Sequence, residues 1–85
     1  MVLLPMKKQH ITDIEQFVID KVKEKRIKMR LSQAQLAYEL NMSVGFIGNV
    51  ESPKYRAKYN LKHLNDLAKV FGCSPRDFLP KEPLS

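Results

Sequence analysis

The chain has 85 residues, of which 44% are hydrophobic, and its formal net charge of +6 gives a pI of about 9.6. This length allows one small domain with a modest core and leaves no room for a second one. Its single cysteine, Cys73, excludes an internal disulfide, so the fold must depend on packing. No apolar run approaches the roughly 20 residues that cross a bilayer. We therefore expect a soluble, cytoplasmic protein whose positive charge suits an anionic partner, although a solvated basic surface would explain the charge equally.

The first segment shows no clear periodicity, and Pro5 would interrupt a helix that began before it. We therefore expect a flexible arm over residues 1–12. Thr12 or Asp13 can cap a first helix that runs to about Met29, with an inner stripe of Ile14, Phe17, Val18 and Val22. The second half of this helix is basic, which predicts a solvated face.

Residues 31–51 carry the pattern of two short helices joined by a tight turn. Ser32 is a good N-cap because its hydroxyl can accept from unpaired amides of the next turn. The helix after it has an inner face of Leu36, Ala37 and Leu40. Asn41 then stands where the helix must stop, since asparagine tolerates the left-handed conformation found at helix ends.

Ser43 caps the second of these helices, which we expect over residues 44–51. Ile47 and Val50 are three residues apart and therefore face the same core. The opposite side carries Val44, Gly45, Gly48 and Asn49. The two helices together predict a helix-turn-helix, in which the second helix lies in the DNA major groove.

The preceding helix makes the resemblance to a known family specific. From Val22 the chain reads VKEKRIKMRLSQAQLA, which closely resembles the DNA-binding domains of the lambdoid phage repressors and Cro, founders of the XRE-like bacterial regulators. The resemblance covers roughly residues 14–79, and FGCSPRDFL resembles the closing helices of that family. It implies an all-α, compact five-helix, lambda-repressor-like domain over residues 13–79, followed by a tail over residues 80–85.

The same resemblance implies three residue roles. Arg26 and Glu51 occupy the positions of the family's inter-helix ion pair, for which the planar guanidinium favours arginine over lysine. Gln33 begins the second helix, where by resemblance its side chain contacts the DNA backbone and braces the start of the recognition helix. A solvent-exposed glutamine is the alternative.

The recognition helix departs from the family at its outward positions, which usually carry Arg, Gln, Asn or Thr. Asn49 is suited to a bidentate contact with adenine, and Val44 can meet a thymine methyl group. The two glycines cost roughly 1 kcal/mol each in helix propensity. Close approach of the backbone to DNA would account for them, and close packing against another protein is the rival explanation. Phe46 lies at the rim, where we expect a half-buried packing residue.

The loop SPKYRAKYN after this helix begins with Pro53, which ends the helix. Its cations Lys54, Arg56 and Lys58 alternate with Tyr55 and Tyr59, and these side chains can reach phosphate oxygens. Arg56 or Lys58 could alternatively enter a narrow minor groove, and an ordinary solvated loop is the simpler explanation. Asn60 caps a fourth helix, whose amides could hold another phosphate.

The fourth helix, over residues 61–71, has an inner face of Leu64, Leu67, Ala68 and Phe71 and ends at Gly72. His63 is expected at an exposed position and Cys73 as core filler. Ser74 and Pro75 begin a short last helix through Leu79, in which Phe78 and Leu79 face inward. Pro80 and Pro83 prevent its continuation.

These features predict a sequence-selective, double-stranded DNA-binding transcriptional regulator, most simply a repressor associated with the nucleoid. A homodimer on a palindromic operator is expected, with Leu79, the tail and the arm as candidate dimer surfaces. No cofactor or metal is expected. The proposed DNA-binding set is Gln33, Ser43, Val44, Gly45, Phe46, Gly48, Asn49, Lys54, Arg56, Lys58 and Asn60.

Two alternatives come from other classes of protein. The first is a protein-interaction module, such as an antitoxin whose recognition face has drifted from DNA. The second is an enzyme, which the sequence disfavours because His10, His63 and Cys73 form no recognisable set of nucleophile, base or metal ligands. Duplex binding separates the first alternative from the leading hypothesis.

Overall fold

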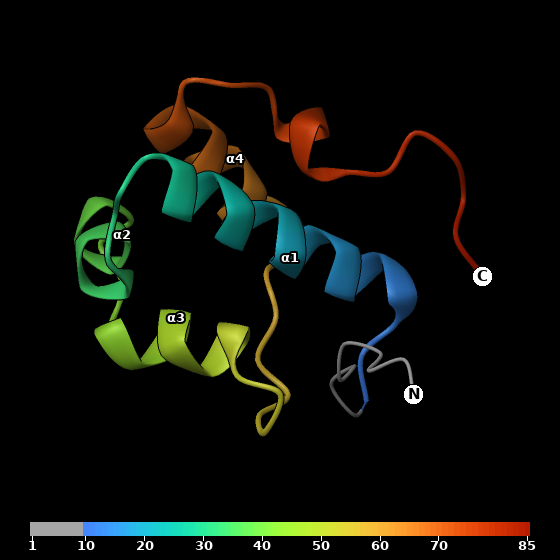
Figure 1. Ribbon diagram of the computed structural model, residues 1–85, viewed down its shortest axis with the longest axis horizontal. Coiled ribbons are helices and arrows are strands. Elements are labelled where there is room, and N and C mark those ends of the chain that lie inside the picture. The colour runs from blue at the N-terminus through green and yellow to red at the C-terminus, as the bar shows by residue number, and fades with distance from the viewer. Residues whose placement is uncertain (1–9) are drawn as a thin grey trace.

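A computed structural model of the protein describes residues 10–85, in which every regular element is a helix. The elements are α1 (Asp13–Lys28), α2 (Gln33–Glu39), α3 (Val44–Glu51), α4 (Leu61–Phe71) and the 3-10 helix η1 (Pro75–Phe78). In Figure 1, α1 crosses the middle of the molecule, with α3 along the lower edge and α4 on the opposite side. The expected all-α class is confirmed for these residues.

The expected fifth α-helix is a single 3-10 turn, so the predicted count of five helices is wrong. Ser74 caps this turn and Pro75 begins it. Leu79 ends it in an extended conformation, with φ −105° and ψ 150°. The cause is Pro80, because the ring of a proline disfavours the helical conformation of the residue before it.

The domain begins earlier than expected. Ile11 is 6% exposed and belongs to the core, and Thr12 forms a capping box with Glu15. The boundary of the expected arm at residue 12 is therefore wrong, while residues 1–9 lie outside the described part of the chain. Along α1 the buried side chains are Val18, Ile19 and Val22. Ile14, expected in the inner stripe, is 43% exposed because its face of the first turn lines an open groove.

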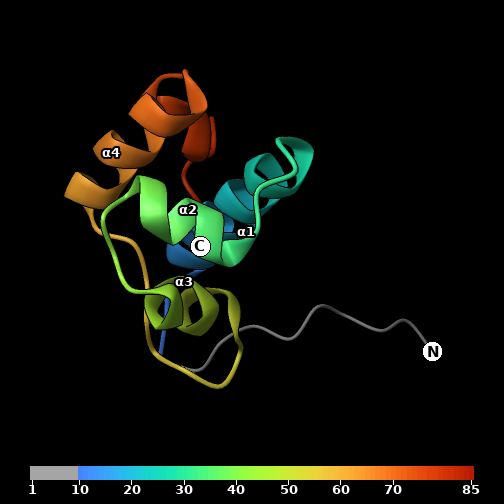
Figure 2. The same ribbon diagram turned by 90° about the vertical axis from the view of Figure 1, so that its left-hand side faces the viewer.

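The helix-turn-helix forms as its capping residues indicate. Ser32 caps α2 and Ser43 caps α3, while Asn41 adopts a left-handed φ of 55° between them. Figure 2 shows α2 lying across α3. The crossing is closed by side chains with no exposed surface, namely Leu36, Ala37, Ile47 and Val50.

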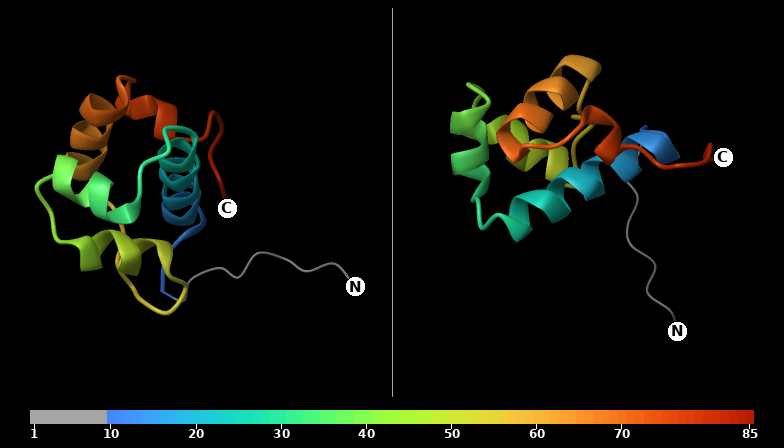
Figure 3. Two further views of the ribbon diagram at one scale, coloured as in Figure 1. Left: turned by 60° about the vertical axis from the view of Figure 1, so that its left-hand side comes forward. Right: turned by 90° about the horizontal axis from the view of Figure 1, so that it is seen from above.

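The C-terminal elements complete the core against α1. Gly72 ends α4 with φ 67°, a conformation that glycine adopts without strain. Phe78 is fully buried and meets Phe71 edge to face, with ring centroids 6.1 Å apart. Leu79 was expected to face inward and is instead 41% exposed, because the extended residue before Pro80 turns away from the core. The chain after η1 then runs beside α1 (Figure 3).

Within residues 10–85, no helix combines the length and the apolar character that crossing a membrane requires.

Candidate nucleic-acid interface

The outward face of α3 is open to solvent. Val44 is 54% exposed, and Gly45 and Asn49 are also exposed. Ser43 positions the start of this face, since its hydroxyl accepts a hydrogen bond from the Phe46 amide at 3.3 Å. In Figure 1, α3 lies along the lower edge of the molecule. Because Ile47 and Val50 are buried on its inner side, the opposite face of the helix, which carries small and polar residues, points away from the core.

The two glycines of α3 have different surroundings. A Cβ atom at Gly48 would lie 3.4 Å from the side-chain oxygen of Gln33, an ordinary contact with α2. A Cβ atom at Gly45 would meet nothing within 4 Å. Nothing within the described chain therefore requires glycine at position 45, although glycine in a helix costs roughly 1 kcal/mol relative to alanine.

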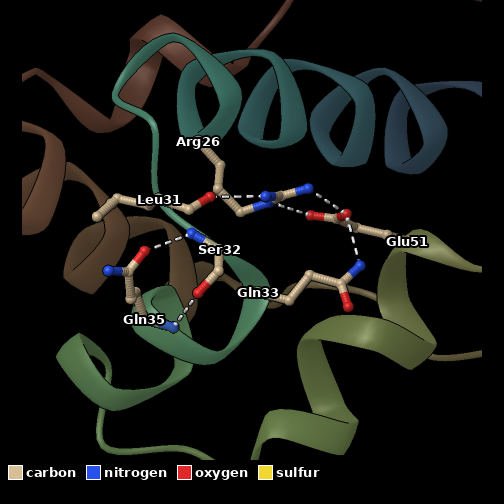
Figure 4. Close-up of polar contacts among 6 residues, drawn as sticks. All are labelled: Arg26, Leu31, Ser32, Gln33, Gln35 and Glu51. Atoms are coloured by element: carbon tan, nitrogen blue, oxygen red, sulfur yellow. Dashed lines mark hydrogen bonds and ion pairs between the residues drawn. The ribbon is translucent and has the colours of Figure 1, made fainter.

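A buried ion pair fastens the end of α3 to α1 (Figure 4). The Arg26 guanidinium donates to both carboxylate oxygens of Glu51, through Nε and one terminal nitrogen, each at 2.8 Å. Its other terminal nitrogen donates to the Leu31 carbonyl at 2.7 Å. The side chains of Arg26 and Glu51 are 11% and 4% exposed. The ion pair implied by the family resemblance is thus present, with the bidentate geometry that only arginine can supply.

Gln33 joins the same network from α2. Its side-chain nitrogen donates to a Glu51 oxygen at 3.0 Å (Figure 4). This contact braces the end of α3, whereas the resemblance had implied the start of that helix. The three-residue network of Arg26, Gln33 and Glu51 therefore holds α1, α2 and α3 in a fixed relative orientation.

An aromatic cluster of Phe46, Tyr59 and His63 packs α3 against the start of α4 and the segment before it. Phe46 packs edge to face on Tyr59 at 6.0 Å and lies 5.1 Å from the His63 ring, measured between centroids. Phe46 is half-buried, as expected. Tyr59 is 9% exposed, so the expectation that its hydroxyl reaches phosphate is wrong. That hydroxyl has no hydrogen-bond partner within the described chain, and burial raises its pKa well above the ordinary value.

His63 is a partner in the cap of α4. Its amide donates to the Asn60 side chain at 2.8 Å, and its Nδ1 accepts from the Asn60 amide at 2.9 Å. The expectation of an exposed histidine is therefore wrong, because packing on Phe46 half-buries the ring. Burial first, and then the charge of Lys62, lowers the His63 pKa. The neutral ring is the form that accepts this hydrogen bond.

The loop between α3 and α4 carries cations and a partly exposed tyrosine. Lys54 and Arg56 are exposed, and Tyr55 is 52% exposed. Lys58 was expected to contact phosphate, but its ammonium lies 2.6 Å from the Glu15 carboxylate of α1. The charge of Lys58 is therefore partly neutralised within the protein, whereas Lys54 and Arg56 remain exposed.

The Glu15–Lys58 pair gives a testable dependence of stability on pH. The Lys58 ammonium, followed by the Thr12 amide, lowers the Glu15 pKa from 4.5 to about 2. The stabilisation is present above the unfolded value and is lost as pH falls from about 4.5 towards 2. We expect the urea midpoint of Glu15→Gln to fall less than that of the wild type between about pH 5 and pH 2.5. Glutamine keeps an oxygen for the cap, and equal pH dependence in the two proteins would contradict the pairing.

The described residues hold no group of three His, Cys, Asp or Glu side chains arranged to bind a metal ion. Cys73 is half-buried against the core, and burial raises the pKa of its thiol, which disfavours the nucleophilic thiolate.

Two interactions in this part of the molecule, those of Glu15 and His63, were not predicted from the sequence. No role was predicted for Glu15, because its partner Lys58 is far along the chain and no local pattern could join them. His63 follows Asn60 by three residues, which is the spacing of a capping box, but histidine stands where glutamate or glutamine usually does. The three-residue spacing from Asn60 could therefore have predicted that His63 takes part in the cap of α4.

Comparison with known proteins identifies the family. Residues 22–78, more than half of the chain, match the family model described as Helix-turn-helix (HTH_3). A hypothetical transcription factor NHTF from Neisseria has a similar crystal structure, with a TM-score of 0.69 and 18% identity over 94% of this chain and 90% of that one. The crystal structure of Apo-HppE gives a TM-score of 0.66 and 21% identity.

The match to Apo-HppE covers 79% of this chain and 36% of that one, so the protein spans about a third of its length. At these identities the two structural similarities concern the fold alone. No curated protein sequence matches the chain. Because the family model spans the ion-paired helices and the whole helix-turn-helix, the chain belongs to the XRE-type helix-turn-helix family of DNA-binding regulators.

Proposed function

We propose that the protein is a sequence-selective, double-stranded DNA-binding regulator, most simply a repressor, that inserts α3 into the major groove. The observation that carries this proposal is the exposed face of Val44, Gly45 and Asn49, on a helix held by the Arg26–Glu51 pair. A rigidly held helix with small outward residues can approach base edges closely. The description of the Neisseria chain as a hypothetical transcription factor agrees with this proposal.

Phosphate contacts supply most of the proposed binding free energy. Lys54 and Arg56 are exposed on the loop that leaves α3, and Gln33 and Ser43 lie at the starts of α2 and α3. Base reading is left to Asn49, with adenine as its partner, and to Val44, which can touch a thymine methyl group. With so few base contacts, DNA shape contributes the remaining selectivity. The protein acts as a homodimer on a palindrome in the bacterial nucleoid, since one such domain reads only a few base pairs.

Selection of bound duplexes from a random pool, followed by titrations at several salt concentrations, tests the proposal. We expect one enriched motif, and an affinity that falls linearly in log K against log salt. Lys54→Ala and Arg56→Ala should each flatten that slope by about 0.9 if each cation neutralises one phosphate. Lys69→Ala, at an exposed position on α4, is the matched control and should leave the slope unchanged.

Asn49→Ala separates base reading from phosphate binding. It should relax the preference at one adenine by about 1 to 3 kcal/mol without changing the salt slope. An unchanged motif would refute the role of Asn49. Absence of salt-dependent duplex binding in the wild type would refute the whole proposal and favour the protein-interaction module.

A further inference from the structure

A cleft of about 580 Å³ lies between α1 and the C-terminal segment of the chain. Among the described residues, its lining comes from α1, from η1 and from the chain after η1, which runs beside α1 (Figure 3). Small-molecule sites in proteins usually have volumes of roughly 300 to 1,000 Å³. The cleft has the size of such a site, and its described lining includes no part of α2, α3 or residues 52–60.

The charge of the cleft is positive. Three cations line it, namely Lys21, Arg76 and Lys81. Asp77 also lines it, but one of its carboxylate oxygens accepts from the Ser74 amide at 3.0 Å in the cap of η1. Within residues 10–85, neither Arg76 nor Lys81 makes an ion pair. The cleft therefore offers uncompensated positive charge to an anion.

One cation and one aromatic ring stand side by side in the α1 wall. The Lys21 ammonium lies 5.6 Å from the centroid of the Phe17 ring, and its side chain is 34% exposed. Its contact with Glu24, at 3.5 Å, holds it from one side only. A ligand that carries a negative charge next to an apolar group would meet Lys21 and Phe17 at the same time.

The rest of the lining is apolar and comes from the chain after η1. Leu79 and Pro80 lie across the cleft lining from Phe17 in the sequence, and Leu79 is 41% exposed. A bare inorganic anion, or a DNA phosphate, would contact the cations and leave these apolar groups in water. Covering them requires a ligand with an apolar part of its own.

We propose that this cleft binds a small organic anion, a carboxylate joined to an aromatic group. The Arg76 guanidinium receives the carboxylate, because its planar fork matches the two carboxylate oxygens. Lys21 and Lys81 add positive charge, and the aromatic group lies against Phe17, Leu79 and Pro80. This site goes beyond the proposed function, and its occupation requires no DNA.

Two-dimensional amide NMR of the full chain, titrated with phenylpropionate, tests the site. We expect saturable shifts in residues 17–21 and 76–81, with a Kd of about 1 mM, as suits so small a probe. Phenylpropionamide keeps the ring without the charge, and acetate keeps the carboxylate without the ring. Each should bind at least about tenfold more weakly than phenylpropionate, since each loses one of the two kinds of contact.

Charge variants identify the residues that hold the carboxylate. Arg76→Gln and Lys21→Gln should each weaken phenylpropionate binding at least about fivefold. Both should melt close to the wild type, because Arg76 is exposed and the Lys21–Glu24 pair lies at the surface. Lys23→Gln is the matched control, since Lys23 is an exposed cation on α1 that does not line the cleft. Its affinity for phenylpropionate should equal that of the wild type.

Three results would overturn the site. The first is the absence of shifts up to about 20 mM phenylpropionate. The second is equal binding of phenylpropionate and either matched probe, which would show that charge and ring are not recognised together. The third is a set of shifts centred on the apolar groove lined by Ile14, Leu61 and Leu64. None of these results bears on duplex binding, which is measured separately and is assigned to α3.

Discussion

Arg26→Ala is expected to lower the melting temperature by about 12 °C or more. The substitution leaves Glu51, whose side chain is 4% exposed, without its bidentate partner, and removes a donor from the Leu31 carbonyl. Breaking one side of a buried pair costs about 3 to 5 kcal/mol, and each kcal/mol shifts the midpoint of a domain of this size by about 4 to 8 °C. Thermal unfolding followed by circular dichroism measures the effect.

Three further variants show whether the loss comes from the pair itself. Lys23→Ala, at an exposed position on the same helix, should change the midpoint little. Arg26→Lys should lose an intermediate amount, since an ammonium cannot make two parallel bonds. The double variant Arg26→Met with Glu51→Leu should recover much of the stability, because no charge is left buried. An unchanged melting curve for Arg26→Ala would show that the pair has no structural importance.

Gly45→Glu is expected to fold normally and to lose about 100-fold in duplex affinity. The position is exposed, and a Cβ atom there meets nothing within 4 Å, so the free protein can accept a side chain. In the proposed complex the new carboxylate faces DNA, where the juxtaposition of like charges costs several kcal/mol. About 2.8 kcal/mol corresponds to the 100-fold loss. Fluorescence anisotropy on the selected duplex, beside a melting curve, measures both properties.

Gly45→Ala gives the companion result. Alanine should raise stability by up to about 1 kcal/mol while weakening duplex binding, because the methyl group occupies the space through which the backbone approaches DNA. Asn65→Glu adds the same charge at an exposed position on α4 instead of α3 and should alter affinity far less. If Gly45→Glu binds duplex as well as Asn65→Glu does, α3 is not the helix that enters the groove.

Local signals were sufficient to predict the four α-helices of residues 10–85. Ser32, Ser43 and Asn60 each accept from an amide of the next turn, as their residue type indicated. Asn41 and Gly72 adopt the left-handed conformation that ends a helix. These assignments succeed because capping depends on residues three or four positions apart. The last element was expected to be a short helix through Leu79 and is one 3-10 turn that ends at Phe78. Pro80 disfavours the helical conformation at Leu79.

Contacts between distant segments could not be predicted in this way. Glu15 and Lys58 are 43 positions apart, and only the packing of the loop against α1 brings their side chains together. Tyr59 looked like a polar loop residue but is buried beneath Phe46. Ile14 and Leu79 fitted the core pattern and instead line an open groove. Periodicity indicates which side chains share a face, but not whether a neighbouring element covers that face.

The sequence by itself determined the four α-helices, their caps and the family, because these depend on short-range spacing and on an ordered motif. The Arg26–Glu51 pair was reached through the family motif rather than through any local rule. The tertiary structure alone decided which cations of the loop after α3 are paired within the protein, and where apolar side chains stay uncovered. Burial and ion pairing are properties of surfaces that meet only after the chain has folded, so no local pattern contains them.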